Sequence, residues 1–291
     1  MADGGKVVDQ SFETTVGLYR DGKVNRRGLI KAIVTLTGGF SAAQVFMEST
    51  GFTGGFWATL EAQAGGVDTE TIHYTSGTTQ VEGYLAKPRG AGPFPAVVIV
   101  HENRGLTDNI RDVARRFAAE GFVALAPDML SRTGGTAALK TPQEATAAIA
   151  RLPTLPALSD LREGFTYLSK HASVNPQRIS TVGFGWGGWR SFSLATMAPT
   201  LAKTVVFYSS TPDDGLANIK GPVLAHYASR DRAITGNSQW TARELKRLGK
   251  TFTFYIYDDT DAGFFNDTAG PRYSATAAKL AWTRTLEFLR G

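Results

Sequence analysis

The chain reads GFGWGG at residues 183–188, between the β-rich run RISTV (178–182) and the stretch WRSFSLA (189–195). A strand that passes through closely spaced glycines into a helix is typical of a nucleophile elbow, the sharp turn that holds a reactive Ser or Cys above a sheet. The reactive residue of such a turn would stand at position 185, where this chain has glycine. The sequence therefore predicts the backbone of a nucleophilic site without its nucleophile.

Patterns typical of strands and helices alternate on both sides of this turn. Upstream of it, Ile110, Val113 and Phe117 recur at the helical period, and Gly121 follows where a left-handed cap would end the helix. Several strand patterns are apolar throughout, which indicates a mostly parallel sheet covered by helices on both faces, an α/β fold. Strands are expected at 71–76, 81–86, 94–101, 122–128, 178–184, 203–209, 222–229 and 251–258. Helices are expected at 107–120, 187–198, 238–248 and 274–289, and a looping and helical stretch is expected between residue 128 and about residue 171.

Three further stretches carry a resemblance to a known family. They are VVIVHENRGLTDNIRDVARRFAAEGFVALAPD (97–128), HYASRDRAI (226–234) and FFNDTAGPRY (264–273). With the elbow, they resemble the dienelactone hydrolase family, in particular its long bacterial branch with an N-terminal Arg-Arg segment. The resemblance implies an α/β-hydrolase fold over residues 67–291.

The family resemblance implies a Cys-His-Asp triad, with a glutamate near the first helix that holds the thiol. Two of these groups are present here, Glu102 in HENRG and Asp231 in SRD. The other two are replaced: Gly185 stands at the nucleophile position, and Ala262 stands where the family histidine precedes a Gly-Phe pair. Gly185 also suits the strained backbone of a tight elbow, Glu102 could be a purely structural carboxylate, and Asp231 could order its loop by pairing with Arg230 or Arg232.

Ligands of open α/β sheets bind at the carboxyl ends of the strands, so the loops there hold the candidate binding residues. The family geometry implies that the backbone N–H groups of Asn103 and Trp186 form an oxyanion hole. Trp186 could equally belong to the core, and Ser209 would lack a histidine to activate it as a replacement nucleophile. The candidate binding residues are Asn103, Arg104, Trp186, Tyr208, Ser209 and Phe264.

Three functions follow from these residues. The first is a protein degenerate as a hydrolase that binds a small carbonyl or carboxylate ligand, or serves as a structural or regulatory partner. The second is a non-hydrolytic enzyme, an isomerase, lyase or hydratase, in which Glu102 acts as acid or base beside the oxyanion hole. The third is residual ester or lactone hydrolysis by water that Glu102 or Asp231 activates.

Composition excludes several other classes of function. The chain has 31 Lys and Arg against 26 Asp and Glu, and these basic residues are scattered, so no nucleic-acid partner is expected. It has no cysteine, which excludes disulfides, thiolate metal sites and a Cys nucleophile. We expect no metal and no cofactor, and the oligomeric state is left open.

Residues 1–66 differ from the rest, since they are rich in Gly and Thr without strand alternation. NRRGLIK (25–31) precedes a weakly apolar run at 32–47, which in outline resembles a twin-arginine export signal. Lys31 and Glu48 make that region too polar for a stable membrane span. We expect a retained helical extension on a cytoplasmic protein, with a periplasmic location through a working or relic signal as the alternative.

Overall fold

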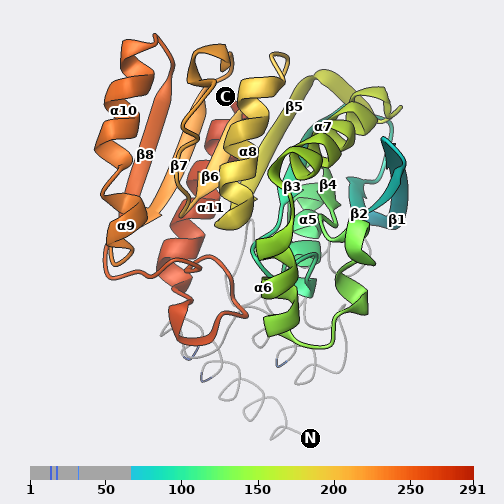
Figure 1. Cartoon of the computed structure of the whole chain (residues 1–291), viewed down its shortest axis with the longest axis horizontal. Coiled ribbons are helices and arrows are strands. Elements are labelled where there is room, and N and C mark those ends of the chain that lie inside the picture. The colour runs from blue at the N-terminus through green and yellow to red at the C-terminus, as the bar shows by residue number, and fades with distance from the viewer. Residues whose placement is uncertain (1–13, 15–17, 19–31, 33–66) are drawn as a thin grey trace, which may run out of the picture.

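An eight-stranded sheet runs through the computed structural model, which describes residues 14, 18, 32 and 67–291 (Figure 1). Its strand order is β1-β2-β4-β3-β5-β6-β7-β8. The two pairings that involve β2 are antiparallel, and all the others are parallel. The strands are β1 (Val67–Ser76), β2 (Thr79–Pro88), β3 (Phe94–Val100), β4 (Val123–Pro127), β5 (Val174–Phe184), β6 (Thr204–Phe207), β7 (Val223–Ala228) and β8 (Phe252–Tyr257).

Helices cover both faces of this sheet, so the fold has three layers (Figure 1). On one face lie α5 (Asp108–Ala119) and α11 (Ala275–Arg290), whose buried side chains include Phe117 and Leu289. On the other face lie α6 (Pro142–Arg151), α7 (Thr154–Lys170), α8 (Trp186–Met197) and α10 (Ser238–Arg247). The predicted α/β fold with a mostly parallel sheet and helices on both faces is confirmed.

The predicted elements agree with the observed ones, with two kinds of difference. The first strand begins at Val67, four residues before its expected start, because its pairing with β2 continues to Pro88 through residues without an apolar alternation. Strand β5 also begins four residues early, at Val174, which pairs with Phe94 of β3. The helical stretch expected between β4 and β5 consists of two helices, α6 and α7, and a one-turn helix that was not predicted, α9 (Arg232–Thr235), follows β7. The predicted extension at 1–66 and its Arg-Arg motif lie outside the described residues, apart from positions 14, 18 and 32.

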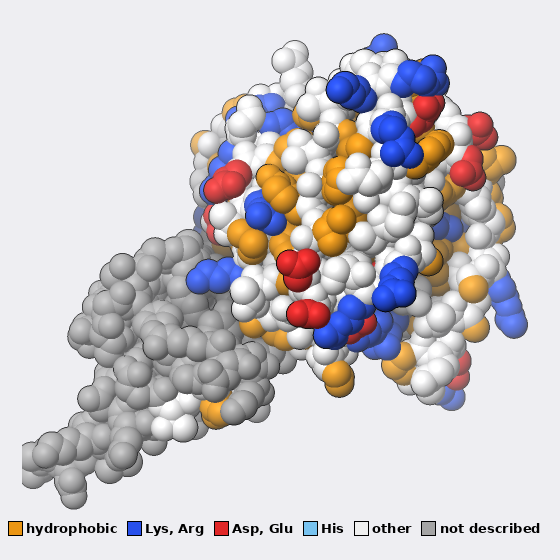
Figure 2. Space-filling model, turned by 90° about the vertical axis from the view of Figure 1, so that its left-hand side faces the viewer, with side chains coloured by type: hydrophobic (Ala, Val, Ile, Leu, Met, Phe, Trp, Pro, Cys, Tyr) orange, Lys and Arg blue, Asp and Glu red, His pale blue; other side chains and the backbone are white. Residues whose placement is uncertain are grey.

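Strand β8 forms one edge of the sheet and has α10 beside it. On that side of the molecule, apolar side chains are interspersed with polar and basic ones (Figure 2). Ile256 of β8 and Trp240 of α10 are among the exposed apolar residues, at 42% and 46% exposure. Among the residues that the structure describes, no helix is both long enough and apolar enough to cross a membrane.

Candidate functional site

The elbow joins β5 to α8 at Gly185, which has φ +51° and ψ −112°. Two neighbouring glycines are required by close packing. A Cβ at Gly183 would collide with the carbonyl oxygen of Gly187, and a Cβ at Gly187 would collide with the carbonyl oxygens of Val100 and His101. The glycines that frame the turn therefore let β5, α8 and the end of β3 approach one another.

Gly185 differs from those two glycines because space is available for a side chain. A Cβ there would meet only ring carbons of Tyr208, at 3.8 Å, an ordinary van der Waals distance. The positive φ is the remaining obstacle, and it costs a non-glycine residue about 1–3 kcal/mol. The turn thus has the strained backbone of a nucleophile elbow and room for a nucleophile, while its residue supplies none.

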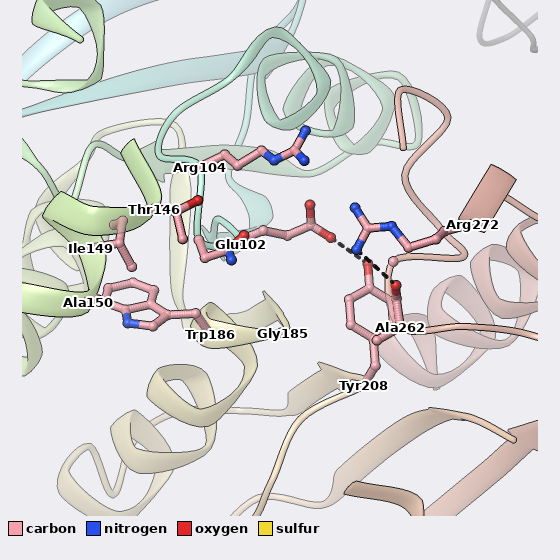
Figure 3. Close-up of a pocket in the computed structure, with 12 residues that line it drawn as sticks. Glu102, Arg104, Thr146, Ile149, Ala150, Gly185, Trp186, Tyr208, Ala262 and Arg272 are labelled. Carbon is pink, nitrogen blue, oxygen red and sulfur yellow. Dashed lines mark hydrogen bonds between the residues drawn. The ribbon is translucent and has the colours of Figure 1, made fainter. Parts of the chain in front are cut away.

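Glu102 follows β3, and its side chain extends toward Tyr208 and Arg272 (Figure 3). Its Oε1 accepts a hydrogen bond of 2.9 Å from the Tyr208 hydroxyl, and its Oε2 accepts one of 2.8 Å from Asn266 Nδ2. The side chain is half-buried and lines a pocket. Two neutral donors therefore fix the orientation of the carboxylate.

Tyr208 follows β6 in a left-handed conformation, with φ 37°. Its N–H donates a 2.7 Å hydrogen bond to the carbonyl oxygen of His226, which anchors this unusual backbone to β7. Burial and, second, the adjacent Glu102 carboxylate raise the pKa of Tyr208 well above its usual value. The phenol is therefore a neutral hydrogen-bond donor to Glu102.

A pocket of about 450 Å³ opens at the carboxyl ends of the strands, above the elbow (Figure 3). The loops after β3, β5, β6 and β8 supply most of its wall, and α6 supplies the rest. The lining residues are Glu102, Asn103, Arg104, Thr146, Ile149, Ala150, Gly185, Trp186, Tyr208, Ala262, Gly263 and Arg272.

Two arginines reach into this pocket from opposite sides (Figure 3). Arg272 Nη1 donates a 3.4 Å hydrogen bond to the carbonyl oxygen of Ala262. Within the part of the chain that the structure describes, no carboxylate forms an ion pair with either Arg104 or Arg272. Both guanidinium groups are thus available to an anion.

The indole of Trp186 contacts two groups. The Arg190 guanidinium carbon lies 3.4 Å from the centre of the ring, and the His101 ring stacks against it at 5.7 Å with an interplanar angle of 8°. Arg190 also donates to the Trp186 carbonyl oxygen, and burial lowers its pKa to about 10. Since Arg190 covers a face of the indole, Trp186 acts as a fixed wall of the pocket rather than as an open stacking platform.

Two buried histidines lie near the site, and each uses both ring nitrogens in the core. Met129 N–H donates to His101 Nε2, so His101 Nδ1 carries the proton and donates to the Glu102 carbonyl oxygen. His226 bonds to the hydroxyls of Tyr257 and Thr285. Burial lowers the pKa of His101, and it lowers the pKa of His226 to about 3. Neither ring lines the pocket.

Three predicted site residues lie outside the pocket wall. Asp231 caps α9, where its Oδ1 accepts a 3.3 Å hydrogen bond from Ile234 N–H. Its expected pairing with a neighbouring arginine is wrong for Arg230, which forms ion pairs of 3.5 Å with Asp259 and Asp261.

The other two have partners of their own. The Ser209 hydroxyl donates to the Ser210 carbonyl oxygen, and Phe264 is fully buried with its ring against Tyr208 at 5.5 Å. The structure places the remaining predicted residues together in the pocket: Glu102, Asn103, Arg104, Gly185, Trp186, Tyr208 and Ala262.

Several site residues were not predicted. Asn266 and Arg272 belong to the stretch FFNDTAGPRY, and the family resemblance of that stretch could have indicated that they lie near the site. The α6 residues Thr146, Ile149 and Ala150 carry no sequence signal, because their place depends on how α6 crosses the loops. Among the described residues, no cluster of His, Asp and Glu could hold a metal ion.

The strand order, the elbow and the pocket at the strand ends define the α/β-hydrolase class. Within that class, the chain belongs to the dienelactone hydrolase family, whose model matches residues 81–291.

Comparisons with individual proteins agree with this family. A protein of Saccharolobus solfataricus named "Putative carboxymethylenebutenolidase" is 30% identical over 75% of this chain and 97% of its own length. A protein of Methylorubrum extorquens with the same name is 29% identical over 72% of this chain and 76% of its own length. A solved structure described as a "Putative Dienelactone Hydrolase" from Klebsiella pneumoniae superposes with a TM-score of 0.70, at 26% identity, over 77% of this chain and 98% of that one.

Proposed function

We propose that this protein binds a small carbonyl or carboxylate ligand in the pocket above Gly185 and does not hydrolyse it through a covalent intermediate. One observation carries the proposal: the elbow keeps its strained geometry and opens onto a pocket with two arginines and an oriented glutamate, while its central residue is glycine. The pocket volume of about 450 Å³ suits a small molecule.

The missing groups argue against covalent hydrolysis. Acyl transfer needs a nucleophile and a base within hydrogen-bond reach. Gly185 offers no nucleophilic atom, Ala262 offers no base, and Asp231 caps α9 instead of facing the pocket. Removing the reacting groups of a serine protease lowers kcat by about a million-fold and leaves roughly a thousand-fold over water, from binding and the oxyanion hole.

The backbone supports binding of a carbonyl oxygen or an anion. Trp186 is the first residue of α8, so its N–H has no acceptor within that helix and lies at the positive end of the helix dipole. The N–H of Asn103, on the loop after β3, would be the second donor of the oxyanion hole. These donors do not depend on the side chain at position 185.

A second candidate function is non-hydrolytic proton transfer by Glu102. The observation that favours it is the orientation of the carboxylate, whose two oxygens accept hydrogen bonds from Tyr208 and Asn266 while the side chain faces the pocket. A carboxylate fixed in this way could remove a proton beside a bound carbonyl group, and the oxyanion donors would stabilise the enolate. In this function Glu102→Gln would abolish turnover.

The test of binding is a calorimetric titration with pyruvate, which carries both a carbonyl and a carboxylate. We expect saturable binding to the wild-type protein and at least tenfold weaker binding to Arg272→Gln. The matched control is Arg243→Gln, which removes the same charge from the exposed side of α10, away from the pocket. Absence of binding to the wild type, or an equal loss in both variants, would contradict the proposal.

A further inference from the structure

The charges of the pocket wall do not cancel. The ionisable groups among its lining residues are Arg104, Arg272, Glu102 and Tyr208. Tyr208 is neutral because burial raises its pKa, so two guanidinium groups and one carboxylate leave one positive charge. A ligand with a single negative charge would neutralise the pocket, and neither arginine has a carboxylate partner among the described residues that it would have to give up.

The same wall also contains acceptors that a plain carboxylate cannot satisfy. The carboxylate of Glu102 has about four acceptor positions. It uses one on each oxygen, for the hydrogen bonds from Tyr208 and Asn266. The Tyr208 oxygen, having donated its proton to Glu102, keeps lone pairs of its own. A ligand placed here therefore gains a charge-assisted hydrogen bond if it presents an O–H or N–H group to Glu102.

The net positive charge of the pocket wall favours one kind of hydrogen-bond donor on the ligand over another. An ammonium group would make the ligand a zwitterion with no net charge, so the positive charge of the wall would remain after binding. A hydroxyl group donates to Glu102 without changing the net charge of the ligand. The apolar side chains of Ile149 and Ala150, with Trp186, would cover a short hydrocarbon part of the ligand.

We propose that the pocket selects small monoanionic hydroxy carboxylates, with the carboxylate on Arg104 and Arg272 and the hydroxyl donating to Glu102. This assignment rests on the proposed function, since it names the class of ligand for the same site. The close-up shows the arrangement it requires, because the two guanidinium groups extend into the pocket from opposite sides, with the Glu102 carboxylate between them in this view (Figure 3).

The experiment compares three acids of nearly equal size by calorimetry: 3-methylbutanoate, 2-hydroxy-3-methylbutanoate and valine. We expect the hydroxy acid to bind the wild-type protein about tenfold more tightly than the plain acid, and valine to bind most weakly. Glu102→Gln should reduce the preference for the hydroxyl toward unity while the plain acid still binds. Arg272→Gln should weaken both acids by a similar factor.

Each outcome separates this inference from the proposed function. Equal binding of the plain and hydroxy acids overturns the inference and leaves carboxylate binding intact. Tighter binding of valine overturns it in favour of a zwitterionic ligand. No binding of any acid overturns the proposed function, and the inference fails with it. If Glu102→Gln does not fold, the ratio measured on the wild-type protein alone still decides the inference.

Discussion

The Tyr208 hydroxyl lies 2.9 Å from Glu102 Oε1, and the ring of the same tyrosine lies 3.8 Å from the place where a Cβ at position 185 would stand. One side chain thus orients the carboxylate and lines the space that a nucleophile would occupy. The backbone of Tyr208 is held with φ 37° by a hydrogen bond from its N–H to the carbonyl oxygen of His226 in β7.

Tyr208→Phe removes the hydrogen bond to Glu102 and keeps the ring. We expect a loss of about 1–3 kcal/mol in the free energy of unfolding, because the lost bond had a charged acceptor. Glu102 is only half-buried, so water can take over part of the interaction and should keep the loss near the lower limit. Urea unfolding measures the change. A variant as stable as the wild type would show that this bond contributes little.

Gly187→Ala and Gly185→Ala form a matched pair that tests the architecture of the elbow. The alanine at 187 would collide with backbone carbonyl oxygens at the end of β3, whereas the alanine at 185 would only face the Tyr208 ring. We expect about 1–3 kcal/mol of destabilisation for Gly185→Ala, from its positive φ, and a larger loss for Gly187→Ala. Denaturant titrations of both variants check the order. The reverse order would mean that packing around the elbow differs from this structure.

Restoring both missing groups tests how much of a hydrolase remains. The loop that carries Ala262 lies beside that of Asp231, because Arg230 N–H donates a 3.0 Å hydrogen bond to the Thr260 carbonyl oxygen. Gly185→Cys combined with Ala262→His should therefore hydrolyse p-nitrophenyl acetate at least about a hundredfold faster than the wild type, since general-base catalysis contributes about 10²–10⁴. Gly185→Cys alone is the control and should gain far less. A double variant no faster than this control would show that the site no longer supports the triad geometry.

The buried His226 predicts how stability depends on pH. Burial lowers its pKa in the folded protein to about 3, below the value of about 6.5 expected after unfolding. As the pH falls, the unfolded state therefore takes up this proton before the folded state does. The contribution of neutral His226 to the free energy of unfolding should be fully present above about pH 6.5. It should fall by about 1.4 kcal/mol per pH unit as the pH drops from 6.5 toward 3. Urea unfolding between pH 7 and 5 gives this slope. For His226→Gln this slope should be lower by about 1.4 kcal/mol per pH unit, the value for one proton. An unchanged slope would show that His226 does not cause this pH dependence.

Sequence patterns predicted the sheet, the covering helices and the elbow. The strands and helices depend on local periodicity, and the elbow depends on glycines that leave no space for a Cβ. Glu102 was predicted as a site residue from the family resemblance, and Tyr208 because it lies near the carboxyl end of the strand expected at 203–209. Their mutual hydrogen bond could not be predicted, because it depends on the left-handed backbone of Tyr208, a non-glycine residue for which the sequence gives no signal. Arg272 and the α6 residues depend on how distant loops fold over the pocket.

The central claim is that this α/β-hydrolase scaffold binds at its elbow without covalent catalysis. The most direct test is the reaction with p-nitrophenyl acetate, followed by rapid kinetics and by intact-mass spectrometry of the quenched protein. We predict no burst, no acetylated protein, and a rate no more than about a thousand-fold above that of buffer, because the proposed site has no nucleophile and only the proposed oxyanion donors would contribute. A stoichiometric burst with an acetyl group mapped to a residue that lines the pocket would contradict it.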